Sequence, residues 1–461
     1  MIHTRILKAL SLCSIATLFV FTNTIAQTEV SMIFVGDVMQ HDGQIEAARN
    51  SANDTYEYED GFKFVKPILN QYDLRVANLE VTLAGAPYKG YPQFSAPDEL
   101  SETLVNSGFN VILTANNHSC DRGSKGVVRT LDVLDKLGVK HTGTFRSIAE
   151  RNKNYPLMIE ENGIRIAMLN YTYGTNGLSV SAPLIINYID SAVIKKDVER
   201  AKELKADYIV CNMHWGTEYK PLPNNYQKRF ESYCYDLGVD MVIGGHPHVV
   251  QPIEKKNIEN QEKLTVWSLG NFVSNMKVRY TRGGVMVGAS IKKSNGSTKL
   301  KDVNHWFVYV HPKQEGKIKQ YYILPDFNYI DYREDFMSSS DLQKMSEFFE
   351  DSRSLYAEHT IGSVEKTISE KSAIGALYKS YLKGYYSVYL PDVNDDILLK
   401  KGMSKYLHET VDKDGKSYIV SGVASTYDQA KGHRQFVLDC KMSSEPKIVF
   451  IQLNNVTRVE E

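Results

Sequence analysis

Cysteine, tryptophan and excess charge of either sign are all scarce in this chain. It has five cysteines and three tryptophans in 461 residues, and its formal net charge at pH 7 is −1. Cys120, Cys211, Cys234 and Cys440 are too scattered to predict a disulfide framework or a cysteine metal site, and we expect Cys211 and Cys234 to be buried small apolar residues. The neutral charge, without a basic stripe, argues against nucleic acid as a partner.

Two other features are missing. No glycine-rich loop of the form G-x-x-x-x-G-K-S/T occurs, so we expect neither a kinase nor an ATP-driven synthetase. No internal repeat or low-complexity block is visible either. What remains is an ordinary globular balance of 42% hydrophobic and 24% charged residues, in a chain long enough for one large domain and a smaller one.

The first 26 residues differ from the rest. A positively charged start with Arg5 and Lys8 precedes the apolar run 9–21, and small residues lead up to Ala26. This pattern predicts a removable secretory signal at 1–26, because the apolar run is shorter than the roughly 20 residues that span a bilayer as a helix. We therefore expect an exported protein, periplasmic or at the cell surface, or membrane-associated if the signal stays uncleaved.

From residue 27 to 326, short runs rich in Val and Ile alternate with stretches of helical period, which predicts an α/β domain. The predicted strands are 30–35, 74–77, 109–114, 164–169, 208–213, 239–243, 264–269, 285–291 and 303–310. The predicted helices are 98–107, 124–137, 192–205 and 224–237, with Gly108, Gly138 and Gly238 at their ends.

The pattern changes after residue 326, and we predict a smaller α+β module at 327–461. Its predicted helices are 339–359 and 363–382, and its predicted strands are 385–390, 418–424, 434–440 and 447–453.

Polar residues of metal-binding type follow five of the predicted strands. They are Asp37, the segment Asn78-Leu79-Glu80, the segment Asn116-Asn117-His118, His214, and the pair His246 and His248. In open α/β sheets, side chains that follow the carboxyl ends of strands converge in one crevice, so one pocket can hold all of them. A bridging carboxylate can neutralise two divalent cations about 4 Å apart, while imidazoles and an amide oxygen complete their shells without adding charge. The pattern predicts a site for two divalent ions, with Mn, Zn and Fe all suited to such ligands.

In order and strand context, these motifs resemble the calcineurin-like metallophosphoesterase superfamily and, more closely, the CapA family of bacterial capsule and poly-γ-glutamate synthesis proteins. The motifs are GDVM at 36–39, NLE at 78–80, ANNHSCDRG at 115–123, YTYGTNG at 171–177, HWGTEY at 214–219, GGHPHVVQPIE at 244–254 and SLGNF at 268–272. The resemblance covers roughly residues 30–290 and implies a four-layer α-β-β-α sandwich.

The resemblance also implies roles for individual residues. Glu80 would bridge the two metals. Asn117, His214 and His246 would complete one site, and Asp37 and His248 would help to form the other. His118 takes the place of the superfamily's catalytic histidine, and Asp121, three residues later, is placed to orient its imidazole.

Two departures bear on the metals. Met39 stands where the superfamily has a histidine ligand, and a thioether is a poor ligand for a hard divalent ion, so one metal site is expected to be weak or empty. His41 is either a replacement ligand or a surface loop histidine. Glu80 replaces an aspartate and is longer by one methylene, which leaves the metal separation open.

Further residues near these motifs are candidates for contact with a substrate. Tyr171, Tyr173 and Asn176 lie on a predicted loop after a strand, and Glu218 with Tyr219 follows His214. The alternative is that the aromatic residues cover an edge of the core. Asn271 is either a turn former or a hydrogen-bond partner of a ligand.

Three functions fit these observations. The first is a metal-dependent hydrolase, phosphoesterase-like, acting on a cell-envelope substrate. The second is a non-catalytic metal-binding accessory protein for the synthesis or export of an anionic polymer, with membrane-bound synthesis machinery as a partner. The third, a structural protein with a relic site, is the weakest, because the potential ligands named above all remain.

Overall fold

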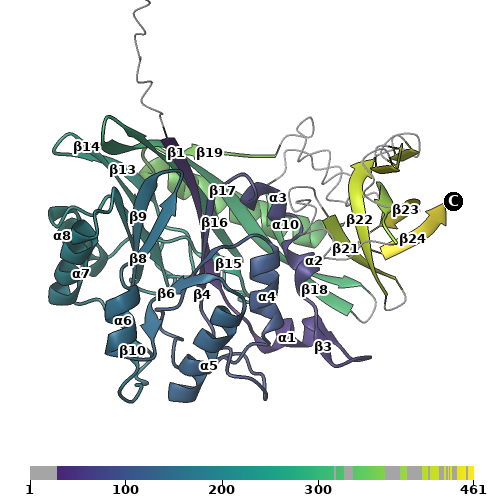
Figure 1. The fold of residues 1–461 in the computed structure, drawn as a ribbon, viewed down its shortest axis with the longest axis horizontal. Helices are drawn as coiled ribbons and strands as arrows, with labels where there is room; N and C mark the ends of the chain where they lie inside the picture. The colour runs from purple at the N-terminus through teal and green to yellow at the C-terminus, as the bar shows by residue number, and fades with distance from the viewer. Residues whose placement is uncertain are drawn as a thin grey trace, which may run out of the picture.

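In the computed structural model, two mixed β-sheets face one another and helices cover their outer faces (Figure 1). The structure describes residues 28–315, 318–326, 336–368 and 385–391, and shorter stretches at 408–413, 416–424, 430–431, 434–435, 437–438, 444–452 and 455–460. The predicted secretory signal lies outside the described residues. The predicted α/β class is confirmed.

The first sheet has nine strands. In spatial order seven of them are β18 (Ile318–Pro325), β17 (Ser297–Glu315), β16 (Gly283–Ser294), β1 (Thr28–Val38), β4 (Leu74–Leu79), β5 (Val111–Leu113) and β6 (Lys140–Thr142), while β15 (Asn271–Val273) pairs with β1 and β19 (Val364–Glu365) with β17. The strands β1, β4, β5 and β6 run parallel, and β16, β17 and β18 extend the sheet in antiparallel hairpin order.

The second sheet has six strands, in the order β13 (Ile253–Ile258), β14 (Gln261–Val266), β12 (Met241–Gly245), β11 (Tyr208–His214), β9 (Ile164–Thr172) and β8 (Leu157–Glu161). Its centre is parallel, and antiparallel strands form both edges. Two short pairs complete the strands before residue 326: β2 (Arg49–Asn50) with β3 (Thr55–Tyr56), and β7 (Thr144–Phe145) with β10 (Ile185–Ile186).

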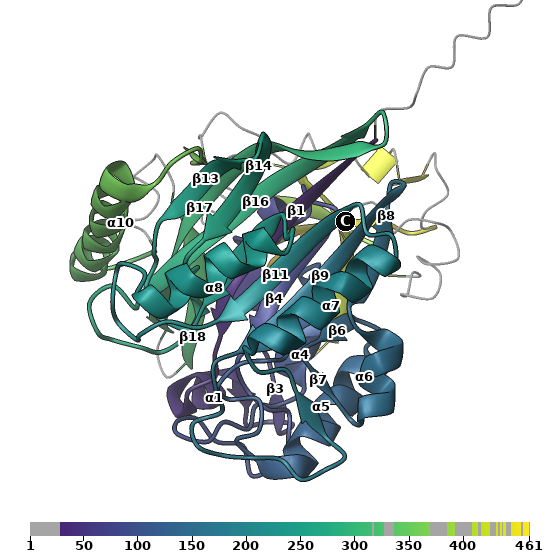
Figure 2. The same ribbon diagram turned by 90° about the vertical axis from the view of Figure 1, so that its left-hand side faces the viewer.

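Helices occupy both outer faces. On the side of the first sheet they are α1 (Asp42–Ala48), α2 (Glu59–Phe62), α3 (Lys66–Leu69), α4 (Glu99–Asn106) and α5 (Gly123–Lys136). Figure 2 shows α7 (Ser191–Glu203) and α8 (Asn225–Asp236) side by side across the second sheet, with α6 (Ile148–Asn154) nearby. Asp190 and Asn224 cap α7 and α8 by accepting hydrogen bonds from backbone N–H groups of the first turn.

Side chains along β11 point alternately to the space between the two sheets and to the helices that cover the second sheet. Tyr208 and Val210 belong to the apolar cluster that fills the space between the two sheets, whereas Cys211 packs with Ile194 of α7 and Cys234 of α8. Successive side chains of a strand point to opposite faces, so a strand that is apolar at every position is buried on both sides. The predictions for Cys211 and Cys234 are confirmed, because both are buried free thiols.

Two predictions beyond residue 326 need correction. The range 363–382 was predicted as helix, but Val364–Glu365 forms β19, because pairing with β17 overrides the local helical period; residues after 368 in that range lie outside the described part. The run 434–440 was predicted as a strand, yet its described residues, 434–435 and 437–438, are helical. Short apolar runs do not distinguish the two states.

The long helix α10 (Ser339–His359) has the predicted bounds, but it packs onto the main sheets. Its Phe348 and Tyr356 belong to the main core, and the Tyr356 hydroxyl donates to the Gln251 carbonyl at 3.1 Å. The predicted boundary at 326 therefore precedes two elements, α10 and β19, that contact the main domain, and the domain division stays a prediction. The remaining strands pair as a closed sheet in the order β20 (Tyr385–Tyr389), β22 (Lys416–Ala424), β21 (His408–Lys413), β24 (Asn455–Glu460) and β23 (Lys447–Gln452).

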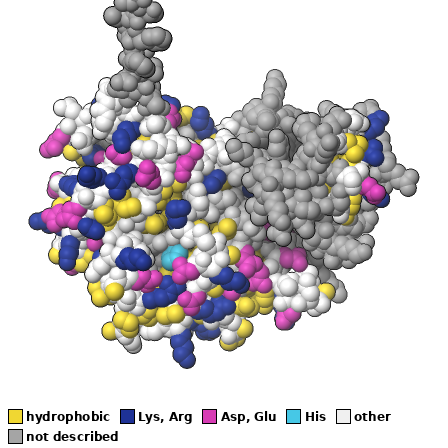
Figure 3. All heavy atoms as spheres, in the orientation of Figure 1, with side chains coloured by type: hydrophobic (Ala, Val, Ile, Leu, Met, Phe, Trp, Pro, Cys, Tyr) yellow, Lys and Arg dark blue, Asp and Glu magenta, His cyan; other side chains and the backbone are white. Residues whose placement is uncertain are grey.

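The surface carries no large field of one sign on the face shown in Figure 3, where acidic and basic side chains are interspersed. This agrees with the neutral net charge. Within the described residues, no helix is both long enough and apolar enough for a membrane span.

Candidate metal centre

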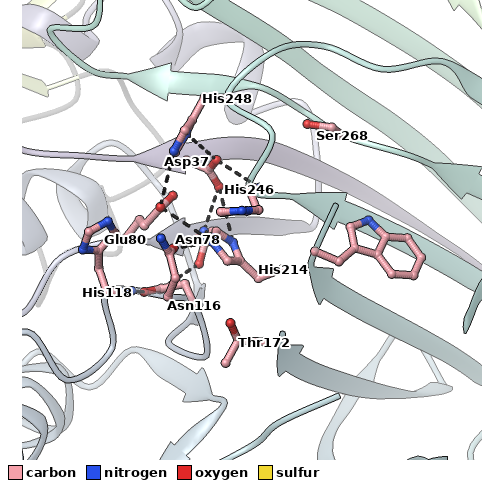
Figure 4. A network of polar contacts seen from close by, with 12 residues as sticks. Asp37, Asn78, Glu80, Asn116, His118, Thr172, His214, His246, His248 and Ser268 are labelled. Carbon is pink, nitrogen blue, oxygen red and sulfur yellow. Dashed lines mark hydrogen bonds and ion pairs between the residues drawn. The ribbon is translucent and has the colours of Figure 1, made fainter. Parts of the chain in front are cut away.

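The polar residues that follow the strands meet in one buried cluster between the carboxyl ends of the two sheets (Figure 4). Asp37 lies on β1 and Glu80 directly after β4, both from the first sheet. His214 ends β11, and His246 and His248 follow β12, both strands of the second sheet. All five residues are buried. The predicted convergence is therefore confirmed by the geometry.

Glu80 belongs to two sets of potential metal ligands. One set is Asp37, Glu80 and His214, and the other is Glu80, His246 and His248; in each, the ligand atoms lie within 4.8 Å of one another. That spacing is close to the span of two ligand bonds of about 2 Å each. A carboxylate that bridges two metal ions must lie within reach of both ligand sets, as Glu80 does. The predicted pair Asp37 and His248 also lies close together, with 3.4 Å between Oδ2 and Nδ1, so the division of the ligands between two ions stays a prediction.

The two buried carboxylates of the cluster have pKa values shifted in opposite directions. Burial and the neighbouring charge of Asp37 raise the pKa of Glu80 well above its usual value. Burial would also raise the pKa of Asp37, but hydrogen bonding to His248 and the proximity of His214 outweigh it, so this pKa is lowered overall. Both carboxylate oxygens of Glu80 are buried without a hydrogen-bond partner. Burying a carboxylate in this way costs free energy unless a cation pairs with it. The carboxylates and imidazoles of the cluster therefore fit divalent metal ions.

Two of the imidazoles, those of His214 and His246, are held neutral, as metal ligation requires. Burial lowers the pKa of His214 to about 3, and burial together with His214 lowers the pKa of His246 well below its usual value. His246 and His248 have positive φ angles of 97° and 57°, a conformation uncommon outside glycine. This turn directs the His246 backbone N–H at Asp37, with 3.3 Å between N and Oδ2.

Asparagine side chains orient several of the ligands. Asn117 Oδ1 lies 2.7 Å from His214 Nε2, as expected for a ligand of the same site. His248 Nδ1 lies 3.0 Å from Asn271 Oδ1, and the Asn271 amide also donates to the Thr281 carbonyl, which fixes its orientation. Asn271 is thus a partner of a ligand, one of its two predicted roles.

Two further asparagines, Asn78 and Asn116, follow the predicted strands and connect ligands by hydrogen bonds. Asn78 Nδ2 donates to Asp37 Oδ1 at 2.8 Å, and Asn116 Nδ2 donates to Asn78 Oδ1 at 3.1 Å. Asn116 Oδ1 accepts from the backbone N–H of His118 at 3.1 Å. The chain of amides connects the Asp37 carboxylate with the segment that carries His118. Both asparagines stand near predicted ligands in the sequence. That position indicates a role in orienting the ligands, because the hydrogen-bond partners of metal ligands are commonly polar neighbours.

His118 and Asp121 lie together, as predicted. His118 Nδ1 is 2.7 Å from Asp121 Oδ2, which also accepts the Phe94 backbone N–H at 2.8 Å. Since an ionised carboxylate only accepts hydrogen bonds, this pairing places a proton on Nδ1 and leaves Nε2 available for proton exchange. The Phe94 ring packs edge-on against the imidazole at 4.6 Å between centroids.

His41 belongs to neither of the two ligand sets. Met39 is buried in the apolar core. His41 is half-buried before α1, with Nδ1 3.1 Å from Gln44 Oε1 and 3.3 Å from the backbone nitrogen of Asn275. The idea that His41 replaces the missing ligand is therefore not supported, because its Nδ1 holds the start of α1 and a neighbouring loop.

The residues predicted to contact a substrate divide into two groups. Tyr171 is fully buried and donates its hydroxyl to Asp197 at 2.8 Å, so its predicted role is wrong. Tyr173 lies two residues further, beyond the end of β9, where its exposed ring is 4.5 Å from His246. Asn176 accepts from Asn117 at 3.4 Å, and Glu218 is exposed on the loop after β11.

Comparisons with known proteins agree with the motifs. The family described as bacterial capsule synthesis protein PGA_cap matches residues 31–276. The PGA biosynthesis protein CapA of Bacillus subtilis (strain 168) is 29% identical over 281 residues, which cover 59% of this chain and 70% of the relative. The capsule biosynthesis protein CapA of Bacillus anthracis is 27% identical over 284 residues, covering 59% of this chain and 66% of the relative.

Solved structures show weaker likeness. The NAD nucleotidase of Haemophilus influenzae has a TM-score of 0.39 and 13% identity, covering 77% of this chain and 60% of that chain. The calcineurin-like phosphoesterase YfkN of Bacillus subtilis has a TM-score of 0.35 and 12% identity, covering 61% of this chain and 90% of that chain.

Proposed function

Since the chain belongs to the bacterial capsule synthesis protein family PGA_cap, we propose that it is a metal-dependent hydrolase of phosphoester type that serves the synthesis of a cell-envelope polymer. One observation carries the proposal: a buried carboxylate shared by two ligand sets lies in the same cluster as a histidine–aspartate pair. A structural site would have no use for a histidine whose second ring nitrogen is left available.

The residues divide the work of hydrolysis. Two bound metal ions would hold the phosphate oxygens and lower the pKa of a water molecule. Asp37 and Glu80 would balance the metal charge, while His214, His246 and His248 would hold the ions as neutral imidazoles. The oxygen of a water molecule that has given one proton to solvent would bond to phosphorus as the bond from phosphorus to the leaving oxygen breaks, and protonated His118 would give its Nε2 proton to that leaving oxygen. Asp121 stabilises the imidazolium beforehand and fixes its orientation.

The cellular setting is part of the proposal. The signal-like segment 1–26 supports export, and family membership supports a role in making capsule polymer, such as poly-γ-glutamate, beside membrane-bound synthesis machinery. Fractionation of cells that produce the full chain tests the location. Recovery of unprocessed protein in the cytoplasm alone would contradict it.

A non-catalytic accessory role is the alternative, and the surroundings of Met39 favour it. With Met39 in the apolar core and His41 outside both ligand sets, neither residue adds a ligand to the set of Asp37, Glu80 and His214. Such a protein would bind the carboxylates of an anionic polymer through its metals without cleaving it.

Turnover of 4-nitrophenyl phosphate with added Mn²⁺ separates the two. We expect His118→Ala to lower kcat by about 10²- to 10⁴-fold, the usual contribution of a proton donor, while bound metal is unchanged. His141→Ala is the matched control, because His141 also pairs with an aspartate, Asp135 at 2.9 Å, away from the site. Equal activity of His118→Ala and wild type, or no turnover by either, would reject the hydrolase.

A further inference from the structure

Two exposed tyrosines and one glutamate stand at the mouth of the metal centre. Tyr173 is 41% exposed and Tyr219 is 44% exposed, although both rings lie beside predicted ligands. The ring centroids of Tyr173 and His246 are 4.5 Å apart, and those of Tyr219 and His248 are 6.3 Å apart. Glu218 directly precedes Tyr219 on the loop after β11, and it too is exposed. We name Tyr173, Glu218 and Tyr219 the rim.

The rim is attached firmly to the ligands. The backbone N–H of Tyr173 donates to the His214 carbonyl at 2.9 Å, and that of Tyr219 donates to the Pro247 carbonyl at 2.8 Å. Tyr219 also has a φ of 64°, a conformation that a bulky residue adopts only when its surroundings impose it. The tyrosines are thus held in place although their rings face solvent, which suits a binding surface better than a covering for the core.

The charge of the rim points to its ligand. Glu218 is exposed next to Tyr219, whose ring lies 6.3 Å between centroids from the ligand His248, so its negative charge stands beside the metal centre. A phosphoester that places its phosphate at the metals would bring its leaving group against the rim. An acidic leaving group would meet the like charge of Glu218, whereas an ammonium would pair with Glu218 and lie against the tyrosine rings.

We propose that the rim is a subsite for a leaving group that carries a protonated amine, and that it disfavours leaving groups with a carboxylate. The proposal rests on the hydrolase function above and names its substrate class: phosphoesters of amino alcohols or of amine-bearing chains. It also implies that a chain of carboxylates, such as an anionic polymer, does not enter this subsite.

Two phosphonates of matched length test the subsite without turnover, since their carbon–phosphorus bond is not hydrolysed. They are 3-aminopropylphosphonate and 3-phosphonopropionate, and calorimetry on Mn²⁺-loaded full-length protein gives the ratio of their Kd values. We expect Glu218→Gln to weaken binding of the amine and strengthen binding of the acid, which changes the ratio by about tenfold, as loss of one nearby charge predicts. Glu199→Gln, an exposed glutamate on α7, is the control and should leave the ratio unchanged.

An unchanged ratio in Glu218→Gln, or no measurable binding of either phosphonate to wild type, would overturn the subsite. Turnover of 4-nitrophenyl phosphate by the same preparations keeps the two proposals apart. A changed ratio without turnover supports the subsite and rejects the hydrolase, and turnover with an unchanged ratio does the reverse.

Discussion

Glu80 lowers the stability of the metal-free protein, although the proposed chemistry needs it as a metal ligand. Its side chain is fully buried and next to Asp37, and its pKa is raised by burial and by that neighbouring charge. A raised carboxyl pKa means that the folded metal-free protein holds a proton that the unfolded chain releases. In the absence of metal, stability from this group is therefore lost as pH rises above 4.5, and a bound cation restores it.

The substitution Glu80→Gln should reverse this balance. The metal-free variant should be more stable than wild type by about 1 to 3 kcal/mol, because glutamine is neutral in both the folded and the unfolded chain and does not have to take up a proton on folding. Added Mn²⁺ should then raise the Tm of wild type but not that of the variant. Thermal unfolding with and without Mn²⁺ measures both effects. A metal-induced rise in Tm as large in Glu80→Gln as in wild type would show that Glu80 is not a ligand.

At the scale of elements, the strand ends are placed by close backbone contact. Asp37 is positioned where β1 meets β15, and its backbone N–H donates to the Gly270 carbonyl at 2.9 Å. The residue before it, Gly36, has no side chain, and a Cβ there would lie 2.0 Å from the Gly270 carbonyl oxygen. The glycine thus lets two strands approach closely enough to hold the first metal ligand.

We therefore expect Gly36→Ala to destabilise the fold by about 3 kcal/mol or more, as overpacking against backbone does. Gly174→Ala is the control, since a Cβ at that position meets no atom within 4 Å. Urea unfolding followed by circular dichroism gives both values. Equal stability of Gly36→Ala and Gly174→Ala would contradict the close contact.

The interface of β17 with α10 should respond to pH. His305 and His311 are buried on β17, and burial lowers the pKa of each from 6.5 to about 4, with Arg353 adding to the effect on His305. The folded state keeps both imidazoles neutral where the unfolded chain protonates them, so stability is lost as pH falls from 6.5 towards 4.

Between pH 7 and pH 5, the free energy of unfolding should fall by roughly 1 to 2 kcal/mol for each of these histidines. His311→Leu should remove its share, because neither ring nitrogen of His311 has a hydrogen-bond partner to lose. Urea unfolding at the two pH values tests this. The same loss in His311→Leu as in wild type would contradict the assignment.

Across the whole molecule, the sequence predicts most reliably the strands whose apolar runs end in polar residues. The strand β11 follows from such a run, and so does the convergence of Asp37, Glu80 and His214. The sequence does not predict features that change from one residue to the next, such as the burial of a tyrosine, or features that require pairing with a distant strand. Tyr171 and Tyr173 have the same chemistry, but only the second lies beyond the strand end and out of the core. The strand β19 exists because β17 pairs with it.

The most direct test of the metal centre is elemental analysis of the purified protein after loading with Mn²⁺ and removal of free metal. The ligand sets that share Glu80 predict two ions per wild-type chain and a loss of both in Glu80→Gln, with Glu199→Gln unchanged. Less than one ion per wild-type chain, or a full complement in Glu80→Gln, would contradict the assignment of this cluster as a metal site.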